Sequence, residues 1–336
     1  RPGWFATQVR HWQQLAAPLR LELPDGWAPD PADEIILYQT LLGSWPLALE
    51  ANDSGGLQQY LQRLLGWQEK ALREAKLRSS WSSPNGHYEA ACRDYLSQLM
   101  LTPRMTRLRQ AIAAAAQEIA PAGALNSLTQ CLLRMTAPGI PDLYQGVEFW
   151  DFSLVDPDNR RPVDFSSRVA ALDAPVSLND LITHWRDGRI KQTLIRLTLK
   201  LRAALPDVFR QGDYIPLEIE GPCAAHLIAF ARNSGADYVI VVAPIHTWPM
   251  LARQTDDGAS AHRANASSDP IIDPIIDPLR WQDTRIRLPE ALQDRKLYPA
   301  FPAGQPVHGS VTVRDLLADF PLNLLCSTDT FQELAK

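Results

Sequence analysis

The chain has 336 residues, 46% of them hydrophobic, and a formal net charge of −5 from 33 basic and 38 acidic side chains. A chain of this length can bury a large core and can form two or three domains. It has no basic block that could neutralise a track of phosphates, no apolar run as long as a membrane span and no signal-peptide pattern, which argues against nucleic-acid and membrane partners.

The first 135 residues predict a block of helices. Along the first helix, apolar residues recur at steps of four and three on one face: Phe5, Val9, Trp12, Ala16 and Leu19. The second helix should follow Asp33, end at Pro46 and bury a face made of Ile35, Tyr38 and Leu42. A third, marked by Leu57, Leu61 and Leu64, should run to about residue 77.

Three further stretches, 90–100, 105–119 and 124–135, continue the helical period. Prolines stand where these helices should break, because proline lacks the N–H that a helix interior needs: Pro84, Pro103 and Pro121. The sequence therefore predicts separate helices on the two sides of Pro121.

The pattern changes at Pro138. Residues 142–146 predict a short strand between turn signals, and residues 151–180, which are rich in Pro, Asp and Ser, predict a long loop. Helical spacing returns over residues 189–204, and Pro206 follows the end of that helix.

From residue 214 onward the sequence favours strands, which are expected at 226–231, 238–243, 284–288 and 310–313. A turn at residues 233–235 should join the first two into a hairpin. Residues 253–278 are rich in Ser, Ala, Asp and Pro and contain the doubled sequence IIDP, and we expect an extended surface loop there.

The cysteines and histidines show no ligand spacing. The four cysteines are far apart and form no C-x-x-C: Cys92, Cys131, Cys223 and Cys326. We therefore expect no metal, no cofactor and no disulfide framework. Buried thiols in a reducing, cytoplasmic compartment are the expectation.

The most informative segment is 138–165, with the sequence PGIPDLYQGVEFWDFSLVDPDNRRPVDF. It combines aromatic rings, which can cover the apolar face of a pyranose, with carboxylates and guanidinium groups, which can bind its hydroxyls. The part PGIPDLYQGVE resembles the last barrel strand of the α-amylase family, and DPDNRRP resembles the loop after that strand.

Further stretches resemble one group within that family, the maltooligosyl trehalose synthases. They are LYQTLLGSWP at 37–46, SSPNGHYEAA at 82–91 and short pieces between 212 and 232. The resemblance implies an enzyme that isomerises the reducing-end α-1,4 bond of a malto-oligosaccharide into an α,α-1,1 bond, as a step of trehalose biosynthesis.

The resemblance also implies an α+β fold in three parts. Residues 1–136 would be a helical domain inserted before the last barrel strand, and 137–208 the last strand, substrate loop and last helix of a (β/α)8 barrel. Residues 209–336 would be a C-terminal antiparallel β-sandwich. The other barrel strands would lie upstream of Arg1, and that N-terminal barrel portion is an expected partner.

No segment resembles the catalytic carboxylate motifs of the family, so no catalytic residue is assigned, and we expect this chain alone to be inactive. Asp156 and Arg160 match the Asp and Arg that bind glucose hydroxyls in amylase relatives. On spacing alone, the same two residues could equally form a charged turn that is bridged to itself.

Five more residues complete the predicted malto-oligosaccharide site. Tyr144 and Trp150 could contact a sugar ring or lie in the core, and Glu148 is expected to play a structural or supporting role. Asn159 and Arg161 are expected to hold the loop. Four aromatic residues of the helical motifs could line a reducing-end pocket, although we favour helix packing for them: Tyr38, Trp45, Trp81 and Tyr88.

Two alternatives remain open from the sequence. One is another α-amylase-family hydrolase or glucanotransferase, because DPDNRRP is not restricted to the synthases. The other is a non-catalytic module that binds glucan or a partner protein, which the missing carboxylate motifs favour. We also expect the segment 138–180 to depart from barrel geometry, because a strand at 142–146 would lack neighbours.

Overall fold

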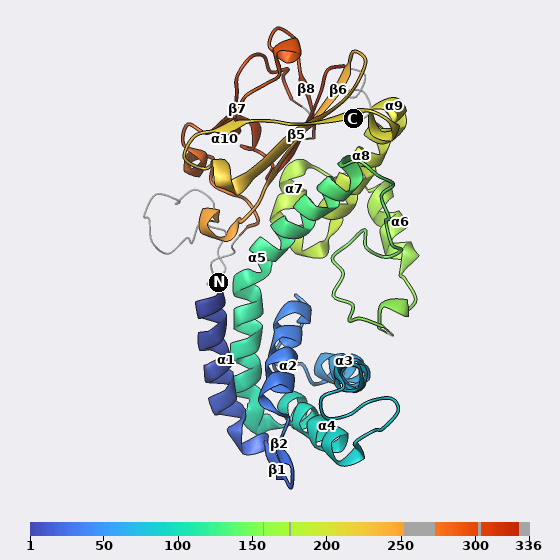
Figure 1. Cartoon of the computed structure of the whole chain (residues 1–336), viewed down its shortest axis with the longest axis vertical. Helices are drawn as coiled ribbons and strands as arrows, with labels where there is room; N and C mark the ends of the chain where they lie inside the picture. The colour runs from blue at the N-terminus through green and yellow to red at the C-terminus, as the bar shows by residue number, and fades with distance from the viewer. Residues whose placement is uncertain (157, 175, 252–272, 302–303, 329–336) are drawn as a thin grey trace. The chain divides into compact units, whose positions relative to one another are not determined.

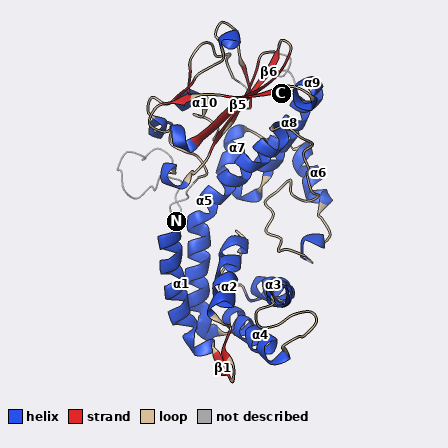
Figure 2. Ribbon diagram, in the orientation of Figure 1, coloured by secondary structure: helices blue, strands red, loops and turns tan. Residues whose placement is uncertain are grey.

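The computed structural model describes the chain except residues 157, 175, 252–272, 302–303 and 329–336. It contains helices and antiparallel sheets, as the α+β prediction requires. The chain divides into two compact units, which we call the first unit (1–120 with 151–163) and the second unit (121–150 with 164–336). Figure 2 shows that helices dominate the first unit and that the larger sheets belong to the second.

The first unit contains a helical block with one small hairpin (Figure 1). Its elements are α1 Pro2–Ala16, η1 Ala17–Leu19, β1 Leu21–Leu23, β2 Gly26–Ala28, α2 Pro31–Ser44, α3 Ser54–Ala75, α4 Gly86–Leu101, η2 Pro103–Met105, the first half of α5 Thr106–Thr136 and η3 Asp158–Arg160. In Figure 1, α1 lies along the first half of α5, and Arg1 pairs with Glu118 there at 2.8 Å.

Helix α2 begins earlier than the sequence predicted. Asp30, and not Asp33, is its N-cap, and the Asp30 carboxylate accepts a hydrogen bond from the backbone N–H of Asp33 at 2.9 Å. The buried face is also different, since Ile35 is 40% exposed while Leu37 and Leu41 are buried. The helix carries aliphatic residues on more than one side, so periodicity alone could not select the buried one.

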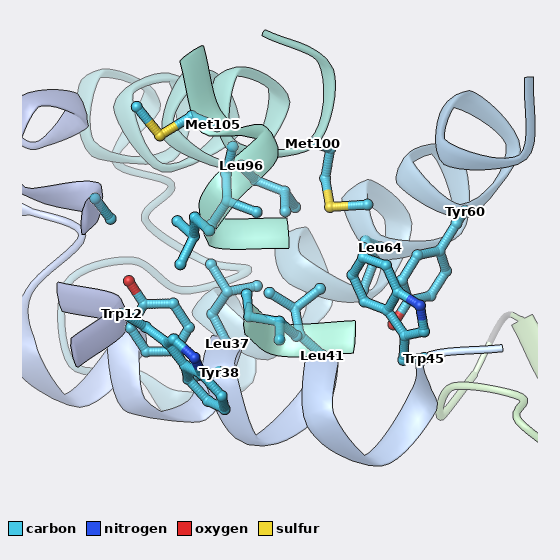
Figure 3. Packing of buried hydrophobic residues seen from close by; sticks show 14 of the residues in the cluster. Trp12, Leu37, Tyr38, Leu41, Trp45, Tyr60, Leu64, Leu96, Met100 and Met105 are labelled. Carbon is cyan, nitrogen blue, oxygen red and sulfur yellow. The ribbon is translucent and has the colours of Figure 1, made fainter. Parts of the chain in front are cut away.

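The helices of the first unit share a hydrophobic core, part of which Figure 3 shows, and a smaller cluster in the same unit contains Leu72, Tyr88 and Cys92. Trp12 and Tyr38 pack with ring centroids 5.5 Å apart, and Trp45 meets Tyr60 edge to face at 5.7 Å. The aliphatic and methionine side chains between these pairs include Leu37, Leu41, Leu64, Leu96, Met100 and Met105. These rings therefore fix how α1, α2 and α3 pack in the first unit.

The predicted break at Pro121 is wrong, because α5 runs through it without interruption. A proline inside a helix removes one hydrogen bond and costs about 3 kcal/mol. Burial on both sides offsets that cost. Ala115 and Ala116 belong to the core of the first unit, whereas Ala122 and Leu125 belong to a core of the second. The border between the two units falls at Pro121.

The helices of the second unit occupy part of the segment predicted as a loop. They are the second half of α5, α6 Phe165–Asp173, α7 Leu178–Thr183, η4 Trp185–Asp187, α8 Arg189–Ala204 and α9 Pro206–Arg210. The prediction of a loop over 151–180 is therefore wrong for α6 and for the start of α7. The Asp and Ser residues that suggested a loop act as N-caps, since Asp164 accepts from Ser167 N–H and Ser177 from Asp180 N–H.

The predicted strand at 142–146 is also absent. The described residues 137–150 form a loop with a turn at 145–148, closed by a hydrogen bond from Val147 N–H to the Tyr144 carbonyl at 3.2 Å. A lone strand would leave its backbone N–H and C=O groups without partners. No described strand lies beside this segment to pair with it, and the chain adopts a loop instead.

The C-terminal part of the second unit forms two antiparallel sheets. The strands are β3 Asp213–Pro216, β4 Ile219–Glu220, β5 Leu227–Ser234, β6 Asp237–Pro244, β7 Arg285–Ile286, β8 Tyr298–Phe301, β9 Val311–Thr312 and β10 Asn323–Cys326, with α10 Val313–Leu316 after β9. The five-stranded sheet has the order β3-β5-β6-β10-β8, and the three-stranded sheet the order β4-β7-β9. One core contains Ile240 of the first sheet and Ile286 of the second.

The predicted hairpin is confirmed as β5 and β6, with Ser234 opposite Asp237. Of the segment predicted as a surface loop at 253–278, most lies outside the described residues. Its described end is not exposed throughout, because Ile276 is 2% exposed and forms a bridge with Leu251.

All four cysteines are buried and free, as predicted. Burial raises the pKa of Cys92 and of Cys326 to about 12, so both thiols stay protonated near neutral pH. Among the described residues, none of the helices combines the length and apolarity that a membrane crossing requires. Within the same residues there is no cluster of His, Cys, Asp or Glu suited to a metal ion.

Candidate functional site

The segment 151–163 is anchored to α3 by an ion pair. The Arg63 guanidinium donates to both carboxylate oxygens of Asp158, from Nε at 3.0 and 3.2 Å and from Nη2 at 2.9 Å. The same Nη2 donates to the Phe152 carbonyl. The Asp158 side chain is 4% exposed and that of Arg63 is 17% exposed. The fork of Arg63 thus holds the segment at two points.

Asp158 is ionised in this environment. Burial alone would raise the pKa of its carboxyl, but hydrogen bonds from Arg63 and from Leu154 N–H at 2.7 Å outweigh burial and hold the pKa below its usual value. Arg161 adds a further contact, with its Nε 2.8 Å from Asp158 Oδ1. This carboxylate therefore organises the turn around itself, and it leaves little of its surface to a ligand.

Asp156 and Arg160 form a second pair, of which the arginine is the exposed member. Arg160 Nε lies 2.7 Å from Asp156 Oδ1, and Lys70 Nζ of α3 donates to Asp156 Oδ2 at 3.3 Å. The Arg160 side chain is 71% exposed and that of Asp156 is 34% exposed. Asp156 Oδ1 is buried beside Arg160, and Asp156 Oδ2 accepts from Lys70, so the groups that this pair presents to solvent are mainly the planar donors of Arg160. Such donors can bind sugar hydroxyls.

The other two predicted residues of this segment differ from each other. Asn159 is exposed in η3. Arg161 is half-exposed and bonds to Asp158 through both its side chain and its backbone. Arg161 therefore closes the turn that carries Asp156 and Arg160.

The three remaining predicted residues belong to the second unit. Glu148 pairs with Arg168 of α6 at 3.0 Å. Trp150 donates its indole N–H to the Trp185 carbonyl at 2.6 Å and meets the Trp185 ring edge to face. Tyr144 lies in the loop and is 47% exposed. The indole donor of Trp150 is thus occupied by a backbone carbonyl, and Glu148 by an arginine.

The seven predicted site residues therefore divide between the units. Four lie in the first unit, namely Asp156, Asn159, Arg160 and Arg161, and three in the second, namely Tyr144, Glu148 and Trp150. Sequence reasoning missed Arg63, Lys70 and Asp158. Arg63 and Lys70 are seven residues apart on the predicted third helix, which is two turns and one face, and this spacing could have indicated a docking face for an acidic loop.

Three of the four aromatic residues of the helical motifs pack, as favoured. Tyr38, Trp45 and Tyr88 are buried. The Tyr38 hydroxyl shares hydrogen bonds with the Tyr95 hydroxyl at 2.8 Å and with the buried Glu34. Burial raises the pKa of Tyr38 far above its usual range, so this cluster is a neutral-phenol network inside the core. Trp81 differs, because it is 56% exposed.

Comparison with known proteins gives a consistent result. No family model matches the chain. Two curated sequences from strains of Mycobacterium tuberculosis, which carry the name maltooligosyl trehalose synthase, are 36% identical over 254 residues, or 76% of this chain. The chain spans only 28% of the length of those relatives.

Solved structures agree with the curated sequences. The maltooligosyltrehalose synthase of Arthrobacter ramosus is 27% identical with a TM-score of 0.62, and the match covers 94% of this chain and 34% of that one. A maltooligosyl trehalose synthase structure from Sulfolobus tokodaii is 25% identical with a TM-score of 0.65, over 96% of this chain and 35% of that one. The resemblance noted in the sequence is confirmed, and the chain is homologous to a C-terminal portion of the maltooligosyl trehalose synthases.

Proposed function

We propose that the chain is the C-terminal part of a maltooligosyl trehalose synthase of the α-amylase family, glycoside hydrolase family 13. The whole enzyme isomerises the reducing-end α-1,4 bond of a malto-oligosaccharide into an α,α-1,1 bond, as a cytoplasmic step of trehalose biosynthesis. The observation that carries the proposal is the pair of Asp156 and the exposed Arg160, held on α3 in a chain that matches named synthases over 76% of its length.

In this proposal, Asp156 accepts hydrogen bonds from two hydroxyls of one glucosyl unit, and Arg160 donates to the same unit and orients Asp156. Lys70 neutralises part of the Asp156 charge. Arg63 and Asp158 act indirectly, by fixing the turn that carries the pair. Tyr144 and Trp150, which belong to the second unit, stay predicted sugar contacts of the whole enzyme.

The covalent chemistry needs residues that this chain does not supply. Retaining glycoside chemistry uses a carboxylate nucleophile and a carboxylic acid about 5 Å apart. The family resemblance assigns these to an upstream barrel portion, which we propose as the partner of this chain. Residues 1–136 would then be the inserted helical domain, 137–208 the last strand and helix of the barrel, and 209–336 a β-sandwich that braces it.

The test uses the full-length protein with maltopentaose. Asp156→Ala and Arg160→Lys should each lower kcat/KM about tenfold to a hundredfold, because a charge-assisted hydrogen bond contributes about 1.5–3 kcal/mol and an ammonium does not replace a planar fork. Asp94→Ala is the control, since Asp94 is an exposed carboxylate of α4 in the same unit. If both site variants keep the kcat/KM of Asp94→Ala, the pair is a structural cross-bridge and the proposed site is wrong.

A further inference from the structure

Trp81 is a large aromatic side chain left 56% exposed on the first unit. It lies between α3 and α4 in a short turn that is held by its own hydrogen bonds. Ser80 N–H donates to the Ser83 carbonyl at 3.3 Å, and Ser83 N–H donates to Ser80 Oγ at 3.1 Å. The indole is therefore presented to solvent by an ordered turn.

One face of the Trp81 indole is covered by Arg73. The guanidinium carbon of Arg73 lies 4.8 Å from the ring centroid. Arg73 is itself fixed, because it donates to both carboxylate oxygens of Glu89 at 2.8 Å and pairs with Glu69 at 2.7 Å. The ring is thus supported on one side by a cation that Glu89 and Glu69 hold in place, and the face opposite Arg73 is the one that a ligand could cover.

The support of Trp81 and the support of Asp156 share one face of α3. Lys70, which donates to Asp156 at 3.3 Å, and Arg73, which carries Trp81, are three residues apart. Residues at this spacing are neighbours on a helix surface, with Cβ atoms about 5–6 Å apart. The flat ring and the Asp156–Arg160 pair therefore lie over consecutive positions of the same helix face.

We propose that the open face of Trp81 is a stacking platform for a glucosyl unit of the malto-oligosaccharide, one or more units away from the unit bound by Asp156 and Arg160. The inference rests on the proposed function. An indole face covers the C–H face of a pyranose, while the polar groups beside it bind hydroxyls. The platform would lengthen the site, so that longer chains bind more tightly than short ones.

The first unit offers a matched control. Trp27, in the hairpin of β1 and β2, is 45% exposed and also carries an arginine, Arg20, with its guanidinium carbon 5.1 Å from the ring centroid. Arg20, which supports Trp27, lies outside α3, the helix whose Lys70 contacts Asp156. Loss of an exposed, arginine-backed indole is therefore the same chemical change at Trp27 as at Trp81, without the adjacent sugar-binding pair.

The experiment measures steady-state kinetics of the full-length protein with maltotriose and maltohexaose, and equilibrium binding of maltohexaose by calorimetry. Trp81→Ala should raise KM and Kd for maltohexaose about tenfold, change kcat less than about twofold, and reduce the preference for maltohexaose over maltotriose. Trp81→Phe should keep affinity within about threefold, because it keeps a flat ring. Trp27→Ala should match the wild type.

Unchanged Kd and KM in Trp81→Ala, or equal effects of Trp81→Ala and Trp27→Ala, would overturn the inference. So would a Trp81→Ala variant that loses thermal stability while its affinity stays the same, since that outcome assigns Trp81 to packing against another part of the polypeptide. If the wild type binds maltohexaose with the predicted dependence on Trp81 but forms no trehalose-capped product, the proposed function fails and the platform stands.

Discussion

Replacing Arg63 by alanine should release the 151–163 segment from α3. In the native protein, Asp158 receives three N–H···O contacts from Arg63 at 2.9–3.2 Å. The variant keeps the carboxylate in place while removing its main donor. Asp158 must then stay buried with fewer hydrogen-bond partners or move out to solvent. If it moves out, the turn that contains Asp156 and Arg160 should move with it.

The free-energy cost of Arg63→Ala can be estimated from the burial of the ion pair. Removing one partner of a buried ion pair costs about 3–5 kcal/mol. The Arg63 side chain is 17% exposed and Arg161 still contacts Asp158 at 2.8 Å, so we expect a cost near the lower end, about 3 kcal/mol. Because the segment can detach without unfolding the helices, most of this cost should appear as local opening.

Hydrogen exchange of the Leu154 amide is the assay, since that N–H donates to Asp158 Oδ2 at 2.7 Å. A cost of about 3 kcal/mol predicts exchange faster by about a hundredfold. The control is Arg287→Ala, which removes an exposed arginine from Glu218 at a similar 3.0 Å and should leave the exchange of the Leu154 amide unchanged. If Leu154 exchanges equally fast in Arg63→Ala and in the wild type, the ion pair does not anchor the segment.

Three further predictions concern acid, backbone strain and activity. The pKa of Asp158 lies below its value in an unfolded chain, so its stabilising contribution is complete above about pH 4 and is lost as the pH falls further. The denaturant midpoint of Asp158→Asn should therefore depend less on pH between 7 and 3 than that of the wild type. Parallel curves of midpoint against pH would contradict this prediction. Gly188→Ala should destabilise the protein by about 1–3 kcal/mol in chemical denaturation, because Gly188 has φ of +83° and an added Cβ would lie 2.9 Å from both Phe149 Cβ and Trp150 N. The control is Gly43→Ala in α2, which should be neutral or stabilising because an added Cβ there meets no atom within 4 Å. The 336-residue chain alone should not lower the number of reducing ends in maltopentaose, and a loss above that of heat-inactivated protein would show that the catalytic groups are present after all.

Local patterns were sufficient for much of the helical fold. The helix at 189–204 was predicted to the residue, because its apolar positions keep one period and Pro206 follows its end. The continuity of α5 through Pro121 was not predictable, since it depends on side chains that pack in two different cores. Helix propensity predicts that α5 ends at Pro121, whereas burial of residues on both sides of Pro121 keeps the helix continuous.

In the candidate site, too, local contacts could be predicted from the sequence and long-range contacts could not. Asp156 and Arg160 are four residues apart, and a pair at that spacing can be inferred from the sequence alone. The contacts of this segment with α3 join residues 86 and 95 positions apart in the chain, namely Lys70 with Asp156 and Arg63 with Asp158. The sequence could indicate the basic face of α3, but not which acidic residue each side chain meets. The resemblance to the synthases indicated a sugar-binding role for Asp156 and Arg160, and the structure added the contacts from α3 that hold their turn.

The most direct test of the proposed activity is the linkage of the product that the full-length protein forms from maltopentaose, followed by proton NMR. We predict that the reducing-end anomeric signals decline while signals of an α,α-1,1 linkage grow in equal amount, with no release of glucose or maltose. Growth of new reducing-end signals would instead identify a hydrolase of the α-amylase family, and an unchanged spectrum would identify a glucan-binding protein without this activity.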